Sequence, residues 1–86
     1  MNPLVLPQVN LNGTSREELV SQQLRVMEAL HSTYLSMNDA APNGRDYQLR
    51  PAEFAPAREA WDARMLVVHN MLKEIEAHAL AIQDSK

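Results

Sequence analysis

The chain has 86 residues, a formal net charge of −3 and no cysteine. Its length accommodates one domain at most, and a chain this small usually needs a disulfide, a metal or a partner chain to stabilise its fold. The absence of cysteine excludes disulfides and thiolate metal sites. The net negative charge argues against binding of duplex nucleic acid. A partner chain is therefore the expected source of additional stability.

Residues 1–13 are predicted to form an extended arm, because Pro3, Pro7 and Gly13 surround a short alternation of apolar and polar side chains. An arm cannot bury its own apolar side chains, so these need the rest of the chain or a neighbouring subunit; they are Val5, Leu6, Val9 and Leu11. The segment lacks the basic start of a secretory signal, and no run of the chain approaches the roughly 18 apolar residues of a membrane span. We expect a soluble cytoplasmic protein.

Two overlapping capping boxes predict the start of a helix over 15–38. Thr14 is followed three residues later by Glu17, and Ser15 by Glu18. The apolar side chains of this helix occupy about half of its circumference; they are Leu19, Val20, Leu24, Val26, Met27, Leu30, Tyr34, Leu35 and Met37. Such a face is wider than one partner helix can cover.

Turn-forming residues predict a polar loop over 39–55, with a short helical turn at 52–55. A loop of this length between bundle helices is often functional. A second helix is predicted over 56–83, because Pro56 suits a helix start and the apolar residues that follow alternate spacings of four and three. This heptad seam consists of Trp61, Met65, Val68, Leu72, Ile75, Ala79 and Ile82.

Further apolar residues lie off the seam, Leu66 and Leu80 on one side of the second helix and Val67 and Met71 on the other. Two helices cannot cover all of them together with the wide face of the first helix. We therefore predict one all-α domain over 1–86, an antiparallel two-helix hairpin with an extended N-terminal arm. Copies of the hairpin would assemble into a homo-oligomeric helical bundle, as a dimer or a larger oligomer.

Two polar segments are candidate ligand sites. In the first, a glycine turn leads into a helix start whose backbone N–H groups, hydroxyls and arginine could hold a phosphate or a carboxylate. It comprises Asn12, Gly13, Thr14, Ser15 and Arg16. The alternative is that these residues only cap the helix.

The second candidate site lies in the polar loop and comprises Asn43, Gly44, Arg45, Asp46, Tyr47 and Arg50. The two arginines could pair with anionic oxygens and Tyr47 could stack on a base, as in nucleotide recognition. The alternative is a turn whose arginines pair with helix acids and whose tyrosine covers the end of the hairpin. In one hairpin the two segments lie at opposite ends, whereas an antiparallel dimer would join them in two composite sites.

No metal, cofactor or catalytic site is expected. His69 and His78 are nine residues apart, which does not match the spacing of helical metal ligands, and His31 is expected to be a hydrogen-bonded interface residue. The acidic pairs lie on predicted helix surfaces, and no serine has a recognisable nucleophile motif. We therefore expect a protein that is not an enzyme.

The segments NLNGTSREEL, AAPNGRDYQ and PAEFAPAREAW, followed by the heptad helix, resemble those of small accessory proteins of tailed phages and prophages. The resemblance implies a role in the bacterial cytoplasm against host defence. The architecture is also similar to helical-hairpin sponges of the anti-CBASS and anti-Thoeris kind, by analogy of fold alone.

Three functions follow as hypotheses. The first is a non-enzymatic oligomer that sequesters an anionic nucleotide-type signal, such as a cyclic nucleotide, between its subunits. The second is an inhibitor or adaptor that binds a host defence protein through the arm or through Leu66 and Leu80. The third is a structural component of phage assembly.

Overall fold

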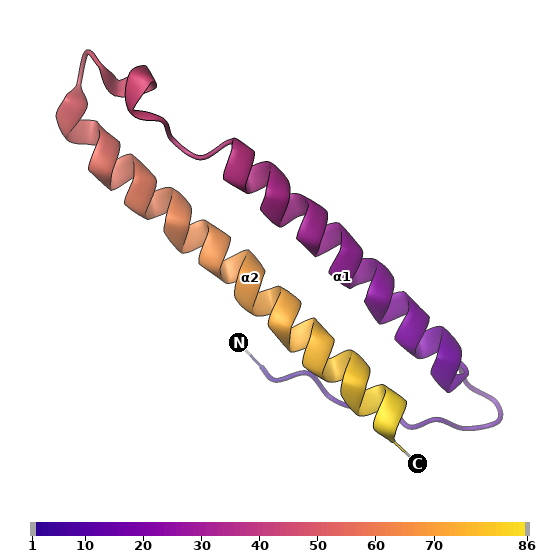
Figure 1. The fold of residues 1–86 in the computed structure, drawn as a ribbon. Coiled ribbons are helices and arrows are strands. Elements are labelled where there is room, and N and C mark those ends of the chain that lie inside the picture. Colours follow the sequence, from indigo (N-terminus) through magenta and orange to yellow (C-terminus); the bar gives the residue numbers. More distant parts are fainter. Residues whose placement is uncertain (1, 86) are drawn as a thin grey trace.

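A computed structural model describes residues 2–85 and shows two long helices packed side by side in opposite directions (Figure 1). Helix α1 spans Arg16–Asp39 and helix α2 spans Phe54–Asp84, and two 3-10 helices lie between them, η1 at Gly44–Tyr47 and η2 at Pro51–Glu53. Between residues 2 and 85 there is no strand. The predicted all-α antiparallel hairpin is confirmed.

Local polar contacts explain where the elements begin. The Ser15 side chain accepts a hydrogen bond from the Glu18 backbone N–H at 3.2 Å, which caps the start of α1. The connection contains two short 3-10 helices, where the sequence predicted a single helical turn. Helix α2 begins at Phe54, two residues before the predicted start, because Pro56 lies within its first turn, where no backbone N–H is needed.

The heptad seam of α2 forms the centre of the hairpin. Its seven residues are all buried or half-buried, and Ile82 is the most enclosed, with 1% of its surface exposed. The matching line on α1 consists of half-buried residues at the same alternating spacing: Gln23, Met27, Leu30, Tyr34 and Met37. This is the knobs-into-holes pattern that pairs two helices along one narrow stripe.

The wide apolar face predicted for α1 is covered along this stripe and at Leu19 and Val20, near the start of the helix. Leu24, Val26 and Leu35 remain exposed, because a single helix cannot reach round half of its neighbour's circumference. His31 is also exposed and forms no side-chain hydrogen bond with the described residues. Within one chain, His31 therefore does not have the hydrogen bond that was expected for it as an interface residue.

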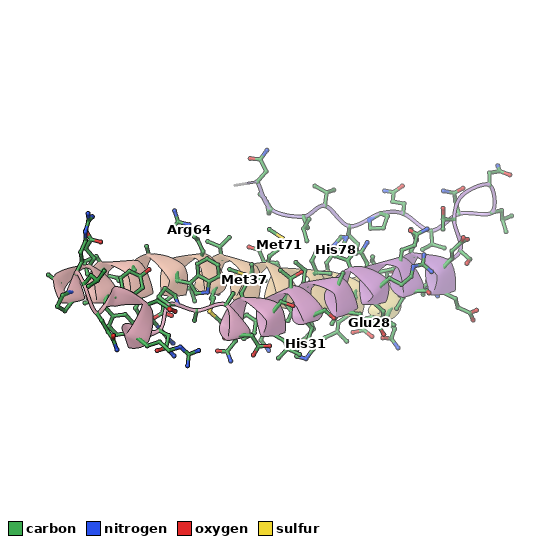
Figure 2. The ribbon with its side chains drawn as sticks, turned by 90° about the horizontal axis from the view of Figure 1, so that it is seen from above. Glu28, His31, Met37, Arg64, Met71 and His78 are labelled. Carbon is green, nitrogen blue, oxygen red and sulfur yellow. The ribbon has the colours of Figure 1, made fainter. Side chains whose placement is uncertain are left out.

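The arm folds back along α2, on the side that carries Met71 and His78 (Figure 2). Pro3, Leu4 and Leu6 line a hollow together with Ala77 and His78. The arm therefore packs on its own hairpin, one of the two surfaces expected for it. It is only partly covered there, because Val5 and Leu11 expose 83% and 103% of their surface.

The molecule is long and thin, with principal extents of 63 × 22 × 17 Å and a radius of gyration of 18.3 Å. A compact chain of this length would have a radius of gyration of about 12 Å. Its accessible surface is 6820 Å², whereas a compact monomer of the same mass would expose roughly 5,100 Å². In the part of the chain that is described, neither helix contains an apolar stretch able to cross a membrane.

Candidate functional site

The polar loop between the helices forms an open hollow at one end of the hairpin. Its volume is about 440 Å³, and it is lined by Arg45, Asp46, Tyr47, Gln48, Leu49, Arg50 and Glu53. Four residues of the second predicted segment therefore line one hollow of small-molecule size, since cavities of roughly 300 Å³ and above accommodate small ligands. Both arginines of the loop are among them.

The two arginines differ in their surroundings. Arg50 Nη1 lies 3.5 Å from Glu53 Oε1, and the two side chains are 77% and 58% exposed. An exposed pair of this kind contributes little to stability, so an anionic ligand can compete with Glu53 for the guanidinium. Arg45 is exposed and forms no ion pair with any described residue. Its guanidinium is therefore available to a ligand.

Tyr47 serves the fold as well as the hollow. Its ring lies 5.8 Å from the ring of Phe54, at an interplanar angle of 49°, and the residue is half-buried. Tilted rings at this separation attract each other. The tyrosine thus covers the end of the hairpin, as the alternative interpretation expected, while part of its surface still faces the hollow.

Asn43 and Gly44 have structural roles in the loop. The Asn43 side chain accepts a hydrogen bond from the Arg45 backbone N–H at 3.1 Å, and its carbonyl accepts one from the Asp46 N–H at 3.0 Å. These bonds form the cap of η1. Gly44 is the first residue of η1 and has no atom within 4 Å of the position a Cβ would occupy. Asn43 holds the loop in shape, whereas the residues that line the hollow come after Gly44.

The first predicted segment is held by Asn10, a residue outside the predicted site. The Asn10 side-chain oxygen accepts a hydrogen bond from the Asn12 N–H at 3.0 Å, and its carbonyl accepts one from the Gly13 N–H at 3.2 Å. A Cβ on Gly13 would lie 3.1 Å from the Asn10 amide. The signal for this turn is the asparagine two residues before Asn12, which is typical of an Asx turn.

Two further members of this segment lie at the start of α1. Ser15 is its cap, so its hydroxyl already accepts a hydrogen bond. Arg16 is half-buried, its Nε has no hydrogen-bond partner, and it lines a hollow with Leu24 of α1 and Gln83 of α2. Thr14 is exposed and forms no side-chain hydrogen bond within the described chain.

The two polar segments lie at opposite ends of the hairpin, as Figure 1 shows. The start of α1 is close to the end of α2, whereas the loop hollow lies beyond the other ends of both helices. One chain therefore does not bring Asn12–Arg16 together with Asn43–Arg50. Any site that uses both segments needs a second copy.

The histidines do not form a cluster. Among residues 2–85, no three histidine or acidic side chains lie close enough together to hold a metal ion. The His69 ring packs 6.0 Å from the ring of Tyr34, at an angle of 50°, which joins the middle of α2 to α1. His78 lies under the arm.

Comparison with known proteins gives no relative. No protein-family model matches the chain, and no curated protein or solved structure is significantly similar to it. The resemblance to accessory proteins of tailed phages therefore stays a prediction.

Proposed function

We propose that this chain is a non-enzymatic binding protein that acts as a homo-oligomer and holds an anionic, nucleotide-type ligand at the polar loop between its helices. The observation that carries the proposal is the hollow of about 440 Å³ at that loop, which two arginines and a tyrosine line. Guanidinium groups suit phosphate oxygens, and an aromatic ring beside them suits a base.

The arrangement favours binding over catalysis. The hollow is open, and its charged groups are exposed to water. An open site does not give the dry, preorganised surroundings in which charged groups accelerate reactions. Binding of a phosphate does not require such dry surroundings, because two arginines that line one hollow supply both positive charge and hydrogen-bond donors.

A second copy would improve the site. The loop hollow of one chain supplies Arg45, Tyr47 and Arg50, and an antiparallel neighbour would add the residues from Asn12 to Arg16 at its α1 start. Ligands held between subunits in this way are removed from solution without being consumed. In the setting that the resemblance implies, the ligand would be a cyclic nucleotide signal of host defence.

Isothermal titration calorimetry of the purified chain tests this proposal. The probes are cyclic dinucleotides, cyclic trinucleotides and ADP-ribose-derived signals. We expect one class of probe to bind. The double variant Arg45→Gln, Arg50→Gln should weaken that binding by at least about tenfold, because it removes one charge-assisted contact or more. Arg25→Gln is the matched control, because Arg25 is an exposed arginine on α1 far from the loop. Absence of heat with every probe contradicts the proposal.

A specific observation also favours a second function, the binding of a host protein. Val5 and Leu11 of the arm expose 83% and 103% of their surface, so the arm presents apolar side chains that a protein partner could cover. Capture of one stoichiometric host protein, and its loss in a Val5→Ser, Leu11→Ser variant, would support this function. An unchanged yield with that variant would contradict it.

A further inference from the structure

One stripe of α1 lies beside the face that packs on α2 and remains exposed. Its members, in order, are Leu24, Glu28, His31 and Leu35, all exposed, and the two leucines expose 49% and 52% of their surface. In Figure 2, Glu28 and His31 project from the side of the hairpin opposite to the arm. Spacings of four, three and four place all four side chains on one face of the helix.

The stripe is complementary to a reversed copy of itself, because its spacings of four, three and four are symmetric and its two inner positions carry an acid and a histidine. If two copies of α1 cross antiparallel about a twofold axis between Ala29 and Leu30, Leu24 of each copy meets Leu35 of the other. Glu28 then meets His31, so a carboxylate faces an imidazole N–H donor. A parallel pairing would set Glu28 against Glu28, which costs free energy. The order of charged and apolar groups therefore selects the antiparallel arrangement.

Helix α2 carries a second pair of leucines on the same side of the hairpin. Leu66 lines a hollow with Tyr34 and Asn38 of α1, and Leu80 lies two heptads after Leu66 on the same face. Both are exposed. The midpoint between them is Lys73.

The midpoint of the α1 stripe, beside Leu30, and the midpoint of the α2 leucines, Lys73, lie at the same level along the hairpin. Tyr34 and His69 are in contact, so they mark one level on the two antiparallel helices. Leu30 lies four residues before Tyr34 and Lys73 lies four residues after His69, which again places them side by side. One twofold axis therefore pairs Leu24 with Leu35 on α1 and Leu66 with Leu80 on α2 at the same time.

The exposed surface fits an interface of ordinary size. The chain exposes 6820 Å², roughly 1,700 Å² more than a compact monomer of its mass. A stable dimer interface buries about 800 Å² on each partner. The excess is about twice the area that one partner of such a dimer buries.

We infer that this side of the hairpin binds a second copy of the chain, antiparallel and centred on the stripe Leu24, Glu28, His31 and Leu35. The inference deepens the proposed function, because the same axis sets Asp39, the last residue of α1, level with Val20 of the other copy. The partner's Arg16 then lies about 6 Å beyond the end of α1, toward the loop. Each loop hollow then has a partner's α1 start beside it. The leucines exclude water, and the Glu28 and His31 pairs set the register.

Disulfide trapping tests the geometry, since the chain has no cysteine of its own. Leu24→Cys and Leu35→Cys chains are mixed in a glutathione redox buffer, and we expect disulfide-linked dimers that contain one of each. Neither variant alone should form them, because Leu24 of one copy lies eleven residues, about 16 Å, from Leu24 of the other. A disulfide needs Cα atoms within about 7 Å. Val26→Cys, an exposed α1 position outside the stripe, is the control and should not be trapped with Leu35→Cys.

Charge exchange provides an independent measurement by analytical ultracentrifugation. Glu28→Arg should weaken self-association by at least about tenfold, and addition of His31→Glu should restore it.

Trapping of Leu24→Cys with itself would instead show a parallel pair, and trapping of Leu24→Cys with Leu80→Cys would show α1 packed on the partner's α2. Either result, or a monomeric mass at every concentration, overturns the inference. A monomer that still binds a nucleotide probe would overturn the interface and leave the ligand assignment standing.

Discussion

The indole N–H of Trp61 donates a hydrogen bond of 2.8 Å to the backbone carbonyl of Met37. Met37 lies in the last turn of α1, where carbonyl groups lose their partners within the helix. Trp61 belongs to the first heptad of the α2 seam, so one side chain both packs in the seam and satisfies the end of the other helix. The bond fixes the two helices in register near the end of α1.

Trp61→Phe should lower the free energy of unfolding by about 1 kcal/mol, because the aromatic ring stays while the Met37 carbonyl loses its donor. Urea denaturation followed by circular dichroism measures the change. Protein concentration must be the same for both chains, since self-association makes stability depend on concentration. Equal stabilities would show that water replaces the indole without cost.

Ile82→Ala should be among the most damaging single truncations, at roughly 2 to 5 kcal/mol, because Ile82 is the most deeply buried side chain of the seam. Thermal and urea denaturation report the loss. Val67→Ala is the matched control, since Val67 is exposed on α2 and lies outside the proposed dimer face. Its effect should stay within about 0.5 kcal/mol.

Ser15→Ala should destabilise the fold by about 1 kcal/mol, because the Glu18 N–H loses its capping oxygen. Thr14→Ala should have little effect on unfolding, since the Thr14 side chain forms no hydrogen bond within residues 2–85. Chemical denaturation of both variants compares them directly. A larger loss from Thr14→Ala would contradict the assignment of Ser15 as the cap.

Arg50→Gln should leave the free energy of unfolding within about 0.5 kcal/mol of the original, because the pair of Arg50 with Glu53 is exposed and weak. The same substitution should reduce the affinity for a nucleotide probe. Denaturation and calorimetry on one preparation separate the two effects. A large loss of stability would assign Arg50 to the fold and argue against the ligand site.

Leu6→Ser should free the arm, because Leu6 lines the hollow between the arm and α2 and is about half covered there. Loss of that contact, at about 1 kcal/mol, should raise the rate of proteolytic cleavage within the arm about fivefold. Val5→Ser removes a neighbouring apolar side chain that faces solvent, so it should leave the cleavage rate unchanged.

The seam and the capping signals determined the hairpin. Alternating spacings of four and three from Trp61 to Ile82 specify one narrow apolar face, and Ser15 followed by Glu18 specifies a helix start. These patterns are local, because helical geometry alone decides which residues share a face. For that reason the two helices were predicted to within about two residues at their ends.

The tertiary structure decided which apolar residues the seam leaves uncovered and where the polar segments lie. The sequence placed Leu24, Val26 and Leu35 on the same wide face as Met27, and only the packing of α2 separated the covered stripe from the exposed ones. The packing of Tyr47 on Phe54 and the Asn10 turn likewise depend on contacts between elements or on a local fold that periodicity does not report. Periodicity describes one helix at a time. Which apolar side chains of a helix are buried, and which residues form a site, depends on the elements that pack against that helix.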